Sequence, residues 1–362
     1  MRKFILKSII MLLMVYIPVI SINYFVDPAN IYHDDIVVNS AKLLNAGNII
    51  ESPKNMDEGL LQVCRMQELN YNPDTVIIGS SHVMYIPFEC DGMLYNAGMS
   101  GSYLGDYYAI VGLLESKNIM PKRIMIGVDP WAFMRSADDG RHSRLDKYSR
   151  FMLDLVKDRH SELEDIEESD MSKLKEIVSF SYFQSSVARL RNMKGDALQA
   201  GGHIRIAVAD NAVIGEAAKI LPDGRRIPSA KEYHDIETLQ KEALQYIASK
   251  RIYQLENGFK DVQQDNLKDF KRLLKFLTTR GVDVHIYLPA WYPSVYEYFK
   301  DDDNFSGVLK IEEAIREIGN EMNIPVHGGY DPKECNLTEK DYMDWLHLKP
   351  EKMLENYNYI RG

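Results

Sequence analysis

The stretch Thr75-Val76-Ile77-Ile78-Gly79-Ser80-Ser81-His82 decides the fold class of this 362-residue chain. A short β-branched apolar run is typical of a strand that is buried on both faces of a parallel sheet. Small polar residues follow the run at once. The stretch therefore predicts a buried strand that ends in a turn carrying a serine.

The segments on either side extend this pattern into an alternation of strands, loops and helices. Such an alternation predicts an α/β fold in which a three-layer parallel sheet is flanked by helices. The predicted strands lie at 75–79, 94–97, 124–128, 282–288 and near 324–326, with the alternating residues of 282–288 on one face. The predicted helices lie near 63–69, 103–116, 235–255, 260–279 and 307–321, with a final helix from Pro350.

A long segment interrupts this alternation and predicts a large, mostly helical insertion at about 135–255. Its first part, 144–195, is charged and helical in pattern, and the acidic run at 161–168 is typical of a solvated helix face. Residues 203–228 suggest a β-hairpin with a turn at 222–225. We therefore expect one α/β domain at 31–362 that contains the insertion.

Charge and cysteine content exclude several classes of function. The net charge of -10 and the lack of a basic stripe argue against nucleic-acid binding. The three cysteines, Cys64, Cys90 and Cys335, lack the spacing of metal ligands. Their odd number argues against a disulfide framework, although a single bridge is still open. The sequence predicts neither a metal nor a cofactor.

The N-terminal segment 1–30 predicts a membrane anchor. Residues 8–26 form an uncharged apolar run, close to the roughly 20 residues with which a helix crosses the hydrocarbon core. Arg2, Lys3 and Lys7 precede the run, so the positive-inside rule places the N-terminus in the cytoplasm and the main domain outside. A cleaved signal peptide is the alternative, but the bulky residues at 21–26 do not resemble a cleavage site.

A second motif, Asp344-Trp345-Leu346-His347, supplies the other parts of a nucleophilic site. A serine hydroxyl needs a base within hydrogen-bond reach, and His347 offers an imidazole. Asp344 could orient that ring and stabilise the imidazolium. Ser81, Asp344 and His347 are therefore candidate catalytic residues. Taken singly, Ser81 could be a turn serine and Asp344 a cap of the next turn.

Further candidates follow the other predicted strands, because ligands of open α/β sheets bind beyond the carboxyl ends of the strands. The backbone N–H groups of Ser81 and Gly101 could stabilise an oxyanion. Additional candidates for oxyanion or substrate binding are Gly98, Asn96, Asp129 and Trp131. The glycines could instead serve only the turn, and Trp131 could pack in the core. His82 is typical of a structural neighbour rather than a second base.

Together these residues resemble the SGNH (GDSL-like) hydrolase superfamily. Its serine block corresponds to Gly79-Ser80-Ser81, its glycine block to residues 96–101 and its last block to residues 344–347. The resemblance implies Ser81 as nucleophile, Gly101 as oxyanion donor, Asp344 as orienting residue and His347 as base. The chain departs from the family where Gly-Asp-Ser reads Gly-Ser-Ser, and where Asp129 stands in the block that normally offers an asparagine.

These departures are similar to a membrane-anchored subgroup that includes the D-alanyl-lipoteichoic-acid protein DltD and the alginate O-acetylation proteins. The resemblance implies an acyltransferase or esterase that acts outside the membrane on a cell-surface polymer, with acetyl as the expected acyl group. It also implies a membrane-bound O-acyltransferase as partner. Two alternatives stay open: a non-catalytic assembly or binding partner, and a freely secreted lipase or esterase.

Overall fold

The computed structural model describes residues 2–26, 35–53, 56–87, 92–159, 177–192, 206–249, 252–255 and 258–357. Three features of the sequence lie outside these residues. They are segment 27–30 of the predicted anchor, the acidic run at 161–168 and Cys90.

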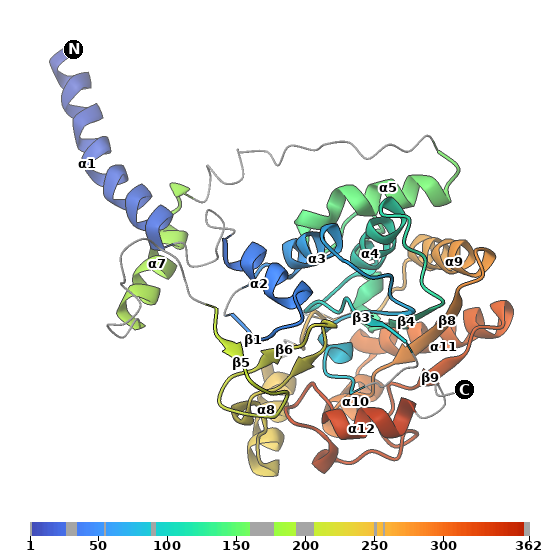
Figure 1. The fold of residues 1–362 in the computed structure, drawn as a ribbon. Coiled ribbons are helices and arrows are strands. Elements are labelled where there is room, and N and C mark those ends of the chain that lie inside the picture. The colour runs from blue at the N-terminus through green and yellow to red at the C-terminus, as the bar shows by residue number, and fades with distance from the viewer. Residues whose placement is uncertain are drawn as a thin grey trace.

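A five-stranded parallel sheet forms the centre of the described structure (Figure 1). Its strands, in spatial order, are β3 (Leu94–Asn96), β2 (Thr75–Ile78), β4 (Arg123–Gly127), β8 (Asp283–Leu288) and β9 (Val326–Gly328). All neighbours run parallel, and Val76 of β2 pairs with Tyr95 of β3 and with Ile124 of β4. The predicted α/β fold with a helix-flanked parallel sheet is confirmed.

Helices connect these strands and cover the sheet. In the view of Figure 1, α3, α4, α5 and α9 lie above the sheet, and α10 and α12 lie below it. The bounds are α3 (Glu58–Gln67), α4 (Leu104–Ser116), α5 (Asp146–Val156), α9 (Gln264–Thr279), α10 (Pro293–Asp301), α11 (Ser306–Met322) and α12 (Pro350–Tyr357).

The central strands are buried on both faces. The sequence placed Val282, Val284, Ile286 and Leu288 on one face of the strand, and all four are buried. In β8 every residue after Asp283 is buried, including His285 and Tyr287. The reason is that a strand inside a three-layer sandwich has packing partners on both sides, so no face of it meets water.

A second, four-stranded antiparallel sheet joins the insertion to the N-terminal part of the domain. Its order is β5 (Val208–Ala209), β1 (Ile49–Glu51), β6 (Lys219–Ile220) and β7 (Arg226–Ile227). The predicted hairpin turn at 222–225 joins β6 to β7. The pairing of β1 with β5 and β6 was not predicted. Helices α2 (Asp35–Asn45) and α8 (Ile236–Ser249) lie beside this sheet in Figure 1.

The N-terminal helix α1 (Arg2–Val26) projects from the α/β body and packs against α7 (Phe180–Asn192) (Figure 1). Asn23 is fully buried, and its side-chain amide donates to the carbonyls of Ile177 and Ser179 at 2.9 and 3.0 Å. The last turns of the predicted apolar run therefore contact protein.

Within the part of the chain that the structure describes, no helix is long and apolar enough to cross a membrane. The prediction that α1 is a transmembrane helix is thus not supported.

Candidate active site

The turn after β2 places Ser81 at the carboxyl end of the sheet. Gly79 has φ of +154°, and a Cβ there would lie 3.0 Å from the carbonyl oxygen of Gly127 at the end of β4. Glycine is therefore required where the two strands approach. The Ser80 hydroxyl then accepts from the N–H of His82 at 3.1 Å and begins a short 3₁₀ turn, Ser81–Val83.

The structure brings Ser81, His347 and Asp344 together in one hydrogen-bonded chain. The Nε2 atom of His347 lies 2.8 Å from the Oγ of Ser81. On the other side of the ring, Nδ1 lies 2.8 Å from Oδ2 of Asp344. A base within reach of the nucleophile, with a carboxylate that fixes the base's tautomer, is the geometry that serine-dependent acyl transfer uses.

The 344–347 loop holds its own carboxylate in place. Oδ1 of Asp344 accepts the N–H groups of Leu346 and His347 at 2.7 and 2.6 Å. Burial raises the pKa of Asp344, but the His347 charge and these hydrogen bonds more than offset it, and the net shift is downward. Asp344 is therefore ionised near neutral pH and can stabilise a protonated His347.

The backbone N–H groups of Ser81 and Gly101 have the character of oxyanion donors. Neither donates to an acceptor within the part of the chain that the structure describes. Gly101 is buried and has φ of +62°, a conformation that favours glycine. Two unpaired, preorganised N–H groups at the carboxyl edge of the sheet can stabilise developing negative charge.

A buried ion pair supports the loop that carries Gly101. Glu58, at the start of α3, accepts the N–H of Ser100 at 2.6 Å and its hydroxyl at 3.3 Å. Arg226 of β7 pairs with the same carboxylate. Burial raises the pKa of Glu58, but Arg226 and the hydrogen bonds from Ser100 lower it by more. The net shift is downward, so the carboxyl is ionised. The insertion therefore helps to hold the glycine loop, a role that no local motif indicates.

Two candidates, Asn96 and Gly98, serve the local structure. The side-chain amide of Asn96 donates to the carbonyl of Val83 at 2.7 Å, and its oxygen accepts the N–H of Gly98 at 2.9 Å. Both polar groups of Asn96 and the Gly98 N–H are thus occupied. Asn96 is almost fully buried and shapes the loop.

The candidates Asp129 and Trp131 lie behind the catalytic residues. Oδ1 of Asp129 lies 2.6 Å from Nδ1 of His82, and both residues are almost fully buried. Trp131 has no exposed surface, its indole N–H donates to the carbonyl of Ser102, and its ring packs 5.7 Å from that of His82. Trp131 therefore belongs to the core and is not a surface platform for a sugar.

The insertion also covers Gly101 with polar side chains. A Cβ on Gly101 would lie 2.9 Å from the Tyr253 hydroxyl, 3.0 Å from the Gln254 side-chain nitrogen and 3.1 Å from a guanidinium nitrogen of Arg141. The ring of Tyr253 packs edge-on against Trp131. Sequence reasoning missed these residues. Arg141 lies in an irregular segment, and Tyr253 and Gln254 lie beyond the end of α8 at Ser249, where the sequence predicted a helix as far as 255.

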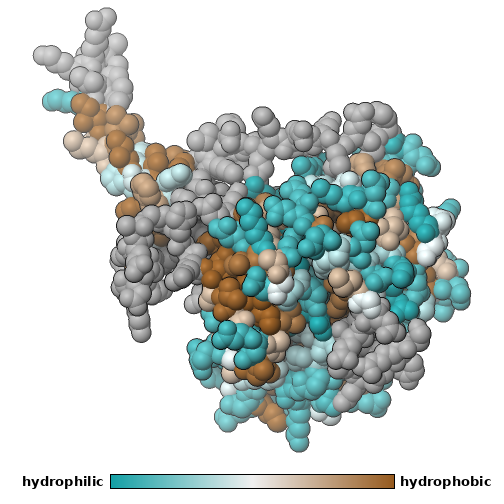
Figure 2. All heavy atoms as spheres, viewed as in Figure 1, coloured by the Kyte–Doolittle hydropathy of each residue, from teal (hydrophilic) through white to brown (hydrophobic). Residues whose placement is uncertain are grey.

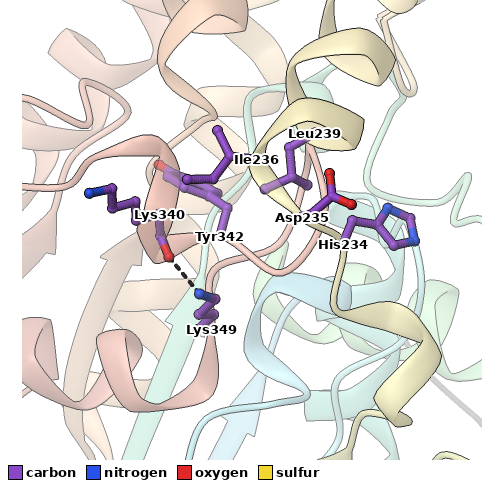
Figure 3. Close-up of a pocket in the computed structure, with 7 residues that line it drawn as sticks. All are labelled: His234, Asp235, Ile236, Leu239, Lys340, Tyr342 and Lys349. Carbon is purple, nitrogen blue, oxygen red and sulfur yellow. Dashed lines mark hydrogen bonds between the residues drawn. The ribbon is translucent and has the colours of Figure 1, made fainter.

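A pocket of about 460 Å³ lies beside the triad loop (Figure 3). The residues before and at the start of α8 line one side, and residues from either side of the 344–347 loop line the other. The lining consists of His234, Asp235, Ile236, Leu239, Lys340, Tyr342 and Lys349. The His234 N–H donates to the carbonyl of Met343, so this pocket adjoins the 344–347 loop.

Within the described residues, no group of three or more His, Cys, Asp and Glu side chains is placed to hold a metal ion. Comparison with models of known protein families and with curated proteins finds no match to the chain.

Proposed function

We propose that this protein is a serine-dependent acyltransferase or esterase. Its substrates would be acetyl or similar acyl esters of a cell-surface polysaccharide or teichoic-acid-like polymer. The observation that carries the proposal is the continuous chain from Ser81 Oγ through the His347 ring to Asp344, with both contacts at 2.8 Å. The resemblance of the serine, glycine and Asp-x-x-His blocks to SGNH hydrolases supports the same chemistry.

In this mechanism Ser81 Oγ attacks the carbonyl carbon of the acyl donor while His347 Nε2 takes the hydroxyl proton. The N–H groups of Ser81 and Gly101 stabilise the oxyanion of the tetrahedral intermediate. The C–O bond to the leaving alcohol then breaks, and His347 returns the proton to that alcohol. The acyl group is left as an ester on Ser81. A glycan hydroxyl or water, deprotonated by His347, then attacks this ester and releases Ser81.

We further propose that α1 attaches the enzyme to the outer surface of a lipid bilayer, with the main domain extracytoplasmic. The supporting observation is a run of exposed apolar side chains on α1, brown in Figure 2, among them Phe4, Met11, Met14 and Phe25 at 71% exposure or more. Exposed apolar surface of this kind marks interaction with a membrane or a protein. The subgroup resemblance adds a membrane-bound O-acyltransferase as a partner.

Labelling of the full-length protein with a fluorophosphonate probe tests the catalytic proposal. We expect covalent labelling of the wild type and none of Ser81→Ala. Ser185→Ala, which removes an exposed serine hydroxyl on α7, is the matched control and should label as the wild type does. Equal labelling of Ser81→Ala and the wild type, or none of either, would reject Ser81 as an activated nucleophile.

One observation favours a second candidate, a non-catalytic assembly partner of an O-acyltransferase. Asp129 stands where the family's oxyanion asparagine is expected, and its carboxylate accepts from His82. The side chains at this site thus offer no donor equivalent to that amide. Full polymer acylation in cells carrying Ser81→Ala together with His347→Ala would support this candidate over the enzyme.

A further inference from the structure

We propose that His82 is a positioning residue, held as an imidazolium by Asp129, that fixes the Leu346 carbonyl so that the 344–347 loop presents His347 to Ser81. The expected effect of His82 on the reaction rate rests on the proposed function. The protonation of His82 and its hydrogen bond to the 344–347 loop do not depend on that function.

The hydrogen-bond partners of His82 determine the protonation state of its ring. Nδ1 lies 2.6 Å from the Asp129 carboxylate, and Nε2 lies 2.9 Å from the carbonyl oxygen of Leu346. A backbone carbonyl only accepts, and so does an ionised carboxylate. Against an ionised Asp129 carboxylate, a neutral imidazole, which carries one N–H, could satisfy only one of these contacts. Both contacts are made when both ring nitrogens carry protons.

The buried surroundings of His82 and Asp129 strengthen the attraction between these two side chains. His82 is 2% exposed and Asp129 is 0% exposed. The rings of Trp131 and Trp291 pack against His82 with centroids at 5.7 and 6.2 Å. Such an apolar, water-poor setting strengthens a paired charge and makes an unpaired one costly.

Few other charged groups face the pair. The Asp344 carboxylate lies near enough to raise the pKa of His82, and the ring of His347 lies 5.3 Å away. Tyr107 and Tyr330 lie near Asp129, but their hydroxyls donate to the carbonyls of Gly127 and Val128. Burial lowers the pKa of His82, yet Asp129, the Leu346 carbonyl and Asp344 together turn the net shift upward.

His82 thereby ties together three segments that lie far apart in the sequence. It follows Ser81 directly, it binds Asp129 at the end of β4, and it binds the residue that precedes His347. Among the described residues, the Leu346 carbonyl is the one backbone group of the triad loop that forms a hydrogen bond with a side chain of the serine turn. Loss of this contact would free His347 to move relative to Ser81, and a displacement of about 1 Å can cost roughly 100-fold in rate.

The first test observes the proton itself. Uniformly ¹⁵N-labelled full-length protein in detergent micelles is measured by NMR, and the His82 ring is assigned as the signal that disappears in His82→Gln. We expect imidazolium nitrogen shifts for His82 at pH 7.5, where an ordinary histidine is neutral. A neutral-ring signal at this pH would overturn the proposal.

The second test separates positioning from a general loss of structure. His82→Gln and Asp129→Asn are compared with His285→Gln, which alters a buried histidine on β8 that contacts His327 and Asp283. With an aryl ester substrate, we expect kcat to fall about 100-fold in both site variants, with little change in KM and no change in His285→Gln. Equal losses of kcat in all three variants would show that His82 contributes only to packing and would reject the positioning role.

The pH dependence of activity gives a further test, because a residue that only packs would not change it. The pKa of His82 is raised in the folded protein, so its contribution is fully present below the ordinary value near 6.5 and is lost as pH rises through the folded value. The alkaline loss of activity should therefore occur at lower pH in Asp129→Asn than in the wild type. An unchanged alkaline limb would contradict the proposal.

These measurements distinguish the two ideas. If the wild type shows an imidazolium at His82 but no reaction with esters or serine probes, the proposed function fails and the hold on the loop stands. If the wild type is active and His82→Gln matches His285→Gln in rate and pH profile, the positioning role fails and the enzyme stands. Should His82→Gln not fold, Asp129→Asn carries the same comparison.

Discussion

The Nε2 atom of His347 lies 2.8 Å from the Oγ of Ser81, although 266 positions separate the two residues in the chain. The contact exists because the serine turn follows β2 and the histidine loop closes over the same carboxyl edge of the sheet after β9.

Asp344→Asn should reduce the rate of acyl transfer by about four orders of magnitude, as loss of the orienting carboxylate does in serine proteases. The asparagine can present an amide N–H where Oδ2 now accepts from His347, and this favours the wrong tautomer. Steady-state hydrolysis of an aryl ester measures the effect. Asp303→Asn, at an exposed carboxylate, is the control, and a comparable loss there would show that the assay reports folding.

Acidification should destabilise the protein through Asp344 and Glu58. Both carboxyls have pKa values below their ordinary ones, so the stability that they contribute is present above about pH 4.5 and is lost as pH falls through the folded values. Urea unfolding at pH 7 and at pH 3.5 measures this difference. The difference should shrink in Asp344→Asn, and a wild-type free energy of unfolding that is equal at both pH values would contradict the prediction.

Glu58→Gln should destabilise the fold by about 3 kcal/mol, because Arg226 would keep a buried charge without its partner. The glycine loop would also lose the charge-assisted bonds from Ser100, so activity should fall about tenfold. Urea unfolding and ester hydrolysis are the measurements. Glu297→Gln removes one partner of the exposed pair with Lys333 and should change neither quantity measurably.

Gly101→Ala should abolish probe labelling of Ser81. The new Cβ would come within 2.9 to 3.1 Å of the side-chain ends of Tyr253, Gln254 and Arg141, so these groups or the Gly101 N–H would have to shift. Gly281→Ala is a control for backbone strain alone, because Gly281 also has positive φ but a Cβ there meets nothing within 4 Å. Similar labelling of the two variants would argue against an oxyanion role for Gly101.

Deletion of residues 2–26 should release the protein from membranes. These residues carry the exposed apolar side chains of α1, and their removal would take away the surface that we propose contacts lipid. Separation of cells into membrane and soluble fractions compares the deletion with the full chain. Recovery of the full chain in the soluble fraction would contradict membrane attachment.

Local sequence was sufficient where the signal is a run of adjacent residues. The β-branched run at 75–78 and the apolar run at 124–128 predicted the central strands, because a strand buried on both faces has little choice of residue. The serine turn and the Asp-x-x-His block were also visible, since each is held by bonds within three residues, such as those from Ser80 and Asp344.

Local sequence did not predict contacts between residues that lie far apart in the chain, because neither residue of such a pair stands in a recognisable motif. Arg226 resembles a surface cation until β1 pairs with β6 and brings the hairpin against Glu58. The apolar run at 8–26 was predicted to span a membrane, yet Asn23 near its end is buried against protein.

The sequence by itself determined the α/β class, the order of the sheet's strand-forming runs, and the three residues of the candidate triad. These depend on side-chain patterns and bonds that act within a few residues. The tertiary structure alone decided that His82 and Asp129 form a buried pair behind the triad, and that the insertion supports and covers the glycine loop. Those features depend on hydrogen bonds and charges between segments that meet only after the sheet has formed, so no local pattern encodes them.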